Sequence, residues 1–184
     1  MNNKINKWAR MLAKFFLSPQ KYARHIGVTF GNNCLIADKD HWSSEPYLVS
    51  IGNDCALTEG VKIQTHGGGR IMRVKYPQFD SFGKVKIGNH VYIGAFSQIM
   101  PGVTIDDNVL VAAGSVVTKS IPSGYVVGGN PAKIICTLDS FIEKNAKYNT
   151  NSKGMNRKEK KAFLLSMTDE IFINKPYLKV PDAK

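Results

Sequence analysis

The chain has 184 residues, of which 43% are hydrophobic and 21% charged, which favours a single globular domain with a buried core and excludes a disordered chain. Its formal net charge of +11 at pH 7 predicts an anionic partner, such as a phosphate group, an acidic sugar, a membrane surface or a nucleic acid. The three cysteines, Cys34, Cys55 and Cys136, form no C-x-x-C pair. We therefore expect free thiols in a reducing compartment, and neither disulfides nor a metal site.

The N-terminal residues 1–24 are predicted to contain an amphipathic helix over residues 4–17. Its apolar face comprises Ile5, Trp8, Leu12, Phe15 and Phe16. Two roles fit this pattern: the helix covers the open end of the fold that follows, or it makes a peripheral contact with an anionic membrane at its inner face. The apolar patch is too short to span a bilayer, is interrupted by a lysine and has no cleavage site after it, so we expect a cytoplasmic protein.

A six-residue repeat dominates the middle of the chain. From residue 87, six consecutive hexads begin with Ile or Val: IGNHVY, IGAFSQ, IMPGVT, IDDNVL, VAAGSV and VTKSIP. An earlier block, IGNDCA, LTEGVK and IQTHGG, starts at residue 51, and a weaker start is led by Phe30 and Ile36. A period of six matches neither a helix nor an ordinary strand. It predicts a parallel β-helix over residues 25–137, in which three hexads form one triangular coil and the lead aliphatic residues point inward.

Two segments depart from the repeat. Residues 67–84, GGGRIMRVKYPQFDSFGK, contain no hexad and are predicted to loop out of the coil. After Pro131 the repeat ends, and residues 138–184 are predicted to form a polar linker and a C-terminal tail with an amphipathic helix near residues 156–173. The predicted fold class is therefore mostly β, with helices at both ends and one looped-out insertion.

The repeats resemble a known group of enzymes. IGNHVYIGAFSQIMPGVTIDDNVLVAAGSVVTKSIPSGYVVGGNPAKII is similar to the C-terminal half of galactoside, maltose and xenobiotic acetyltransferases, which are left-handed β-helix, hexapeptide-repeat acyltransferases. EPYLVSIGNDCALTEGVKIQTHGGG and FFLSPQKYARHIGVTFGNNC look most like sugar O-acetyltransferases encoded with capsule or O-antigen assembly. The resemblance covers roughly residues 15–137. It implies a left-handed coil and a homotrimer that binds acetyl-CoA between subunits, with the insertion completing a neighbour's acceptor pocket.

His66 lies at the end of a hexad, immediately before the insertion. Acyl transfer to a hydroxyl group needs a base, and imidazole suits this role because its ordinary pKa is near neutrality. The resemblance places the family's catalytic histidine at His66, whereas the residues alone leave a surface turn histidine as an equal alternative. Many relatives carry an acidic residue directly after this histidine, but here it is Gly67. The orienting partner of His66 is therefore left open among Glu59, Asp80 and a backbone carbonyl.

The resemblance also implies the other site residues. The backbone N–H of Ala95 matches the family's oxyanion donor. The positions that match CoA contacts are Tyr92, Ala95, Ala113, Ser115, Thr118, Lys119 and Lys133. The predicted acceptor pocket comprises His41, Trp42, Arg70 and Asp80. For His41 and Trp42 the alternative is a loop packed on the coil, and for Tyr92 it is packing in the core or at its rim.

These residues predict an acetyl-CoA-dependent O-acetyltransferase that acts on a sugar hydroxyl of a surface polysaccharide or its precursor. One alternative keeps the reaction and takes a xenobiotic, such as an antibiotic alcohol, as acceptor. A γ-type carbonic anhydrase shares the fold but needs three converging histidines, including a close pair that the sequence lacks. A non-enzymatic nucleic-acid-binding domain is suggested by the charge alone, because no known motif accompanies it. We therefore expect no required metal and no nucleic-acid partner.

Overall fold

The computed structural model describes residues 11–178, so that Ile5 and Trp8 of the predicted N-terminal helix lie outside the described residues. The chain divides into two compact units between Asp139 and Ser140. Among the described residues, the first unit contains a helical segment at residues 11–16, followed by helix α2 (Pro19–His25). The side chain of Ser18 accepts a hydrogen bond from the backbone of Lys21 and so marks the start of α2.

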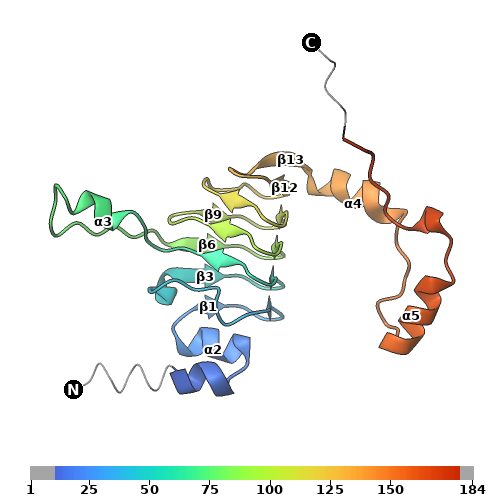
Figure 1. The fold of residues 1–184 in the computed structure, drawn as a ribbon, viewed down its shortest axis with the longest axis horizontal. Helices are drawn as coiled ribbons and strands as arrows, with labels where there is room; N and C mark the ends of the chain where they lie inside the picture. The colour runs from blue at the N-terminus through green and yellow to red at the C-terminus, as the bar shows by residue number, and fades with distance from the viewer. Residues whose placement is uncertain (1–10, 179–184) are drawn as a thin grey trace, which may run out of the picture. The chain divides into compact units, whose positions relative to one another are not determined.

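Short strands form three sheets along the rest of the first unit (Figure 1). The first sheet has the order β1 (Thr29–Phe30), β3 (Val49–Ile51), β6 (Val85–Ile87), β9 (Thr104–Ile105). The second has the order β2 (Leu35–Ile36), β4 (Ala56–Leu57), β7 (Tyr92–Ile93), β10 (Leu110–Val111), β12 (Tyr125–Gly128), β13 (Lys133–Thr137). The third has the order β5 (Lys62–Ile63), β8 (Gln98–Ile99), β11 (Val116–Val117). Pairing within the three sheets is parallel except between β12 and β13.

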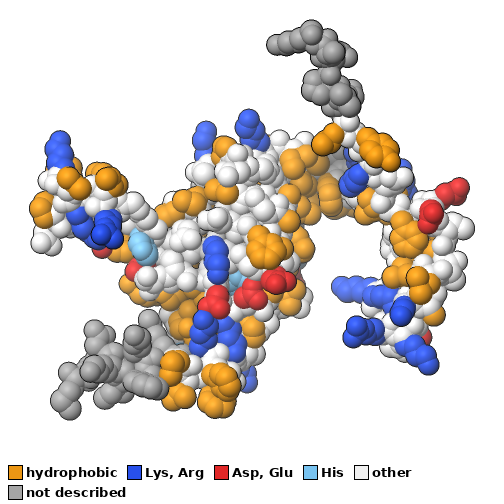
Figure 2. Space-filling model, viewed as in Figure 1, with side chains coloured by type: hydrophobic (Ala, Val, Ile, Leu, Met, Phe, Trp, Pro, Cys, Tyr) orange, Lys and Arg blue, Asp and Glu red, His pale blue; other side chains and the backbone are white. Residues whose placement is uncertain are grey.

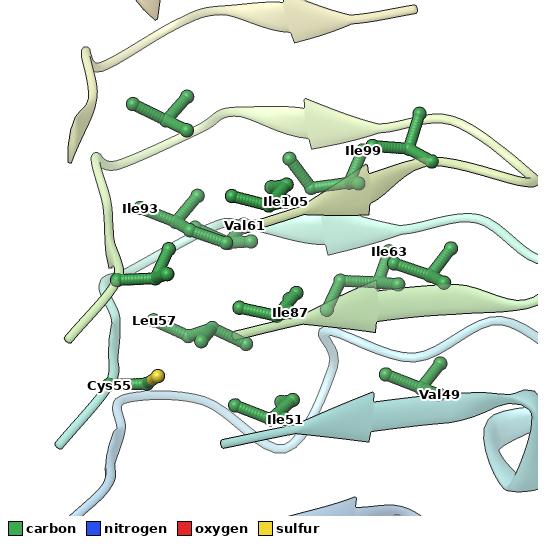
Figure 3. Close-up of a cluster of buried hydrophobic side chains, with 14 of the residues drawn as sticks. Val49, Ile51, Cys55, Leu57, Val61, Ile63, Ile87, Ile93, Ile99 and Ile105 are labelled. Atoms are coloured by element: carbon green, nitrogen blue, oxygen red, sulfur yellow. The ribbon is translucent and has the colours of Figure 1, made fainter. Parts of the chain in front are cut away.

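The pairing register confirms the predicted parallel β-helix. The lead residues of successive coils are paired across each sheet, as in the column Leu57, Ile93 and Val111. Figure 3 shows Leu57 and Ile93 pointing into the interior, where the aliphatic side chains of the lead positions are buried. Burial of each of these aliphatic side chains contributes about 1.5 to 3 kcal/mol to the free energy of folding. The period of six therefore aligns the apolar side chains into a continuous core.

One corner of the coil is built by a ladder of short polar side chains. The Oδ1 atoms of Asn53, Asn89 and Asp107 each accept a hydrogen bond from a backbone N–H of the preceding coil, over 2.9, 2.9 and 2.6 Å. His90 follows this ladder in a left-handed conformation, with φ of 54°. Its exposed turn position agrees with a structural role and not with a catalytic one.

The open end of the first coil is covered by α2 and not by the segment predicted for it. Ala23 of α2 is fully buried and belongs to the core, and the guanidinium of Arg24 lies 4.0 Å from the ring centroid of Phe30. Phe15, which the capping role would bury, is 79% exposed. The capping role of residues 11–16 is therefore wrong for these side chains, because the following helix already fills the position.

The insertion leaves the coil after β5 and returns before β6 (Figure 1). It contains the short helix α3 (Gly69–Met72), and nearly all of its side chains are exposed. The only other short helix within the described part of the coil is η1 (Pro46–Leu48), which precedes β3.

The end of the chain is more helical than we predicted. Helix α4 (Leu138–Ala146) occupies residues that we expected to be a linker. In the second unit, α5 (Arg157–Leu165) begins at a capping box made by Asn156 and Glu159, and η2 (Asp169–Ile171) follows. The predicted helix over residues 156–173 is therefore divided in two. Among residues 11–178, no helix has both the length and the apolar character needed to cross a membrane.

Candidate active site

His66 lies at the neck of the insertion. It forms an isolated antiparallel bridge with Phe82, and the next backbone bond, from Gly83 N–H to Thr65 C=O, spans 2.8 Å. The rings of His66 and Phe82 have centroids 5.9 Å apart. The two ends of the insertion are thus fastened together beside the imidazole, which keeps the ring at a defined place on the surface of the coil.

A carboxylate orients the His66 ring. The Nδ1 atom lies 2.7 Å from Oε2 of Glu45, and the two side chains are 38% and 17% exposed. Because an ionised carboxylate only accepts hydrogen bonds, Nδ1 carries a proton, and the tautomer of the neutral ring is the one with its lone pair on Nε2. Among residues 11–178, Nε2 has no hydrogen-bond partner. This arrangement gives a neutral imidazole a free basic nitrogen facing away from the carboxylate.

Two hydroxyl groups fix the carboxylate in turn. Thr65, which is fully buried, donates its hydroxyl hydrogen to Oε2 of Glu45 over 3.0 Å. The hydroxyl of Ser43 bonds to that of Thr65, and the Thr65 N–H donates to Ser43 over 3.0 Å. Because the Thr65 hydrogen is already used, Ser43 donates to Thr65 in this network. The hydrogen bonds thus run from Ser43 to Thr65, from Thr65 to Glu45, and from His66 to the same carboxylate. This network holds the His66 ring through Nδ1 alone.

Glu45 is the partner that the sequence predictions missed. Trp42 pairs with Ile63 in the neighbouring coil, so Glu45 stands three places after Trp42 just as His66 stands three places after Ile63. The two residues are therefore in register on adjacent coils although they are 21 residues apart in sequence. The lead residues of the first coil, Phe30, Ile36 and Trp42, recur at a period of six. Extending this repeat to Trp42 would have placed Glu45 at the same position of its hexad as His66.

The partners that we predicted for His66 are elsewhere. The carboxylate of Asp80 lies 3.5 Å from the guanidinium of Arg73 within the insertion. The side chain of Glu59 is exposed and makes no hydrogen bond to any part of residues 11–178, whereas its backbone carbonyl accepts from Phe96 N–H. No backbone carbonyl takes the place either, because Nδ1 is occupied by a carboxylate.

His41 is a core residue and not part of an acceptor pocket, so that prediction is wrong. Its side chain is buried, Nδ1 donates to the carbonyl of Val61 over 2.8 Å, and Nε2 accepts from the N–H of Asp38 over 3.1 Å. Trp42 is half-buried against the core, and its Nε1 has no hydrogen-bond partner among the described residues. Trp42 also lines a hollow of about 120 Å³ with Ser43 and Ser44, and its contact with an acceptor stays a prediction.

The buried His41 predicts a loss of stability in acid. Burial lowers the pKa of His41, against the opposing effect of its bond to Val61. In the unfolded chain the imidazole binds a proton near pH 6.5, whereas the native ring resists it, since protonated Nε2 cannot accept from Asp38. The free energy of unfolding should therefore fall below about pH 6.5, by up to about 1.4 kcal/mol per pH unit from this group.

Urea unfolding of the wild type and of His41→Gln across the acidic range measures this contribution. The glutamine amide can both donate and accept, so the variant should fold and show a weaker dependence on pH. Parallel profiles for the two proteins would show that His41 does not resist protonation.

Ala95 lies at a different corner of the coil from His66. It follows β7, at the turn toward β8, whereas His66 follows β5 on the sheet that contains β8. The N–H of Ala95 donates to no group within residues 11–178. Tyr92, on β7, points outward and is half-exposed, which excludes packing in the core. One chain therefore does not bring the predicted oxyanion donor and the predicted base together.

Ser115 does not fit its predicted role in binding CoA. Its side chain is fully buried, and its hydroxyl donates to the carbonyl of Ala112 over 2.6 Å and accepts from Gly129 N–H over 3.3 Å. Its own N–H donates to Ser97, and its carbonyl accepts from Gln98. Every polar group of Ser115 is thus used inside the coil, because this place in the hexad is a tight corner.

The remaining predicted residues are on the surface. Those predicted to contact CoA are exposed along the later coils and β13: Ala113, Thr118, Lys119 and Lys133. Arg70 and Asp80 are exposed on the insertion. Within the described residues, no group of three or more His, Cys, Asp or Glu side chains is placed to hold a metal ion.

The chain is similar to known transferases. A family model described as bacterial transferase hexapeptide (six repeats) matches residues 84–119. The protein CapG of Staphylococcus aureus is 47% identical over 86% of this chain and 94% of its own length. The galactoside O-acetyltransferase of Escherichia coli is 37% identical over 60% of this chain and 52% of its own length.

A solved structure shares the fold. The hexapeptide-repeat acetyltransferase VCA0836 of Vibrio cholerae superimposes with a TM-score of 0.56 and 19% identity, over 70% of this chain and 82% of its own. The long match to CapG and the six matched hexads confirm the resemblance seen in the sequence. The chain therefore belongs to the bacterial hexapeptide-repeat transferases, a family of enzymes that includes acetyltransferases.

Proposed function

We propose that this enzyme transfers an acetyl group from acetyl-CoA to a hydroxyl group of a sugar, in a surface polysaccharide or its precursor, with His66 as general base. The observation that carries the proposal is the imidazole held at Nδ1 by Glu45, with Nε2 left without a partner at the neck of the insertion. A general base for a weakly acidic alcohol needs this tautomer and a ring that does not rotate away.

The proton has a complete path in this mechanism. Nε2 of His66 takes the proton of the acceptor hydroxyl as its oxygen bonds to the thioester carbonyl carbon, and the carbonyl electron pair moves onto oxygen. When the carbonyl re-forms, the carbon–sulfur bond breaks and the imidazolium returns the proton to the departing thiolate. Glu45 stabilises the transient imidazolium, and its bond from Thr65 keeps the carboxylate in place.

The oxyanion needs a donor that His66 does not supply. The free N–H of Ala95 suits this role, since a fixed backbone donor stabilises developing charge without rearrangement. Because Ala95 and His66 lie at different corners of one coil, we propose that the donor comes from a neighbouring subunit. A homotrimer of left-handed coils, packed side by side, would place the two corners across one intersubunit groove.

Acetyl-CoA is expected to lie along that groove. The backbone groups of Ala113 and Thr118 would contact the pantetheine arm beside Tyr92, and the exposed ammonium groups of Lys119 and Lys133 would attract the phosphates. Because acetyl-CoA, the acetyl donor, is made within the cell, we propose that the enzyme acts in the cytoplasm.

A sugar acceptor is supported by the similarity to galactoside O-acetyltransferase. The insertion, with Arg70 and Asp80, projects beside His66 and offers polar groups for hydroxyl-rich ligands. Trp42 adds an aromatic side chain near Glu45.

The acceptor class is tested by measuring release of free CoA thiol from acetyl-CoA. Sugar nucleotides and lipid-linked oligosaccharides are compared with macrolide and other antibiotic alcohols at equal concentration. We expect acceptor-dependent release with a sugar, and mass spectrometry should find one added acetyl group on that sugar. Release with the antibiotics alone would assign the xenobiotic alternative, and no release with any hydroxyl acceptor would reject O-acetyl transfer.

A further inference from the structure

The helical segment at residues 11–16 presents its apolar side to solvent. Phe15 and Phe16 are 79% and 75% exposed, and Met11 and Leu12 are each more than half-exposed. The two phenylalanine rings pack edge to face, with centroids 5.1 Å apart. Figure 2 shows hydrophobic side chains beside Lys and Arg side chains at this end of the β-helix.

Polar groups, and not apolar packing, fasten this segment to the coil. The ammonium of Lys14 forms an ion pair with Asp40. Lys39 donates to the backbone carbonyl of Lys14 over 2.6 Å, at the C-terminal end of the helical segment. Lys14 is thus directed at the coil, whereas the rings of Phe15 and Phe16 are left largely exposed to solvent, unlike those of a helix that packs on a core.

An apolar hollow lies between the segment and the coil. It has a volume of about 740 Å³ and is lined by Met11, Leu12, Phe15, Pro19 and Ala37, with charged side chains of residues 14 and 38–40 at its edge. The edge of the hollow carries Lys14 and Lys39 as well as Asp38 and Asp40. Apolar side chains beside such a charged edge suit a surface whose outer layer is charged and whose interior is apolar.

The charged side chains of the N-terminal 25 residues have one sign. Residues 1–25 contain six Lys and Arg and no Asp or Glu. A protein partner with an apolar surface would not require this excess, whereas an anionic bilayer attracts basic residues next to inserted aromatic side chains.

We propose that residues 11–16, with the adjoining basic residues, dock this enzyme on an anionic lipid bilayer. Phe15 and Phe16 enter the headgroup region, and Lys21 contacts lipid phosphates. The polar bonds of Lys14 and Lys39 fasten the segment to the coil with the two rings exposed, so the β-helix stays in water beside the membrane. Docking needs no turnover, so it stands or falls separately from acetyl transfer.

Co-sedimentation of the full chain with phosphatidylcholine vesicles, with and without phosphatidylglycerol, tests the proposal. We expect binding to the anionic vesicles that weakens with salt. Phe15→Ser with Phe16→Ser should weaken binding by about tenfold or more, and Lys21→Gln by about fivefold. The matched control, Tyr177→Ser with Leu178→Ser, removes two other fully exposed apolar side chains and should bind within about twofold of the wild type.

Absence of wild-type binding to anionic vesicles would overturn the proposal, as would an equal loss in the control. A change in subunit association in the Phe15 and Phe16 variant, with vesicle binding unchanged, would instead assign this surface to a second copy of the chain. Amide hydrogen exchange tests the proposal with the wild-type protein alone, so the result does not depend on whether a variant folds. Anionic vesicles should slow the exchange of the amides of residues 11–17, and protection confined to other segments would contradict docking here.

Discussion

Replacing His66 with Ala should lower kcat by about 10²- to 10⁴-fold, or about 3 to 5 kcal/mol of activation barrier. The acceptor hydroxyl then has no base at the moment its oxygen attacks, while binding of acetyl-CoA elsewhere in the groove persists. The side chain is partly exposed, and its removal leaves the buried columns untouched. The oligomeric state and the thermal unfolding midpoint should therefore stay close to those of the wild type.

Steady-state kinetics of CoA release measure this effect, with His90→Asn as the control. His90 is an exposed turn residue whose left-handed backbone asparagine tolerates, so this variant removes an imidazole without removing the proposed base. We expect its kcat to match that of the wild type. Near-normal turnover by the His66 variant would remove the general-base role and with it the mechanism.

Replacing Glu45 with Gln should lower kcat by about 10- to 1,000-fold. The amide is close in shape to the carboxylate but neutral, so it no longer stabilises the imidazolium. It can also donate to Nδ1 through its NH₂ group, which would move the proton to Nε2 and block the base. The KM for acetyl-CoA should change little, because Glu45 contacts the imidazole and not the proposed CoA residues.

The thermal unfolding midpoint, measured beside kcat, distinguishes a positioning role from a structural one. Loss of the carboxylate should lower kcat while the midpoint stays close to that of the wild type, because Glu45 acts on the reaction through the imidazole. Glu59→Gln is the matched control, since Glu59 is exposed and its side chain makes no hydrogen bond or ion pair among the described residues. An unchanged kcat in the Glu45 variant, or an equal loss in the Glu59 variant, would exclude orientation of His66 by Glu45.

The fold could be predicted because each hexad repeats one physical requirement. An inward aliphatic side chain is needed every six residues, and the pairing of Leu57 with Ile93 and of Ile63 with Ile99 follows directly. The helices at the chain end follow no such period. We predicted a polar linker between the repeats and the C-terminal helix, but residues 138–146, which place Leu138, Phe141 and Ile142 at helical spacing, form α4.

The site was predicted only in part, because its partners come from different coils. His66 was marked by its place before the insertion. Glu45 was not recognised because the first and second coils are separated by three residues beyond the six-residue repeat. The hexads of the second coil therefore cannot be extended backwards to Glu45. His41 and Ser115 carry groups suited to ligands, but the coil uses those groups internally, and only the backbone contacts reveal this.

The most direct test is the crystal structure of the full chain with bound CoA. We expect the CoA sulfur beside Nε2 of His66 in one subunit and near the N–H of Ala95 in its neighbour, with the phosphates close to Lys119 and Lys133. A complex in which the sulfur binds far from His66, with the imidazole facing only solvent, would contradict acyl transfer at this site.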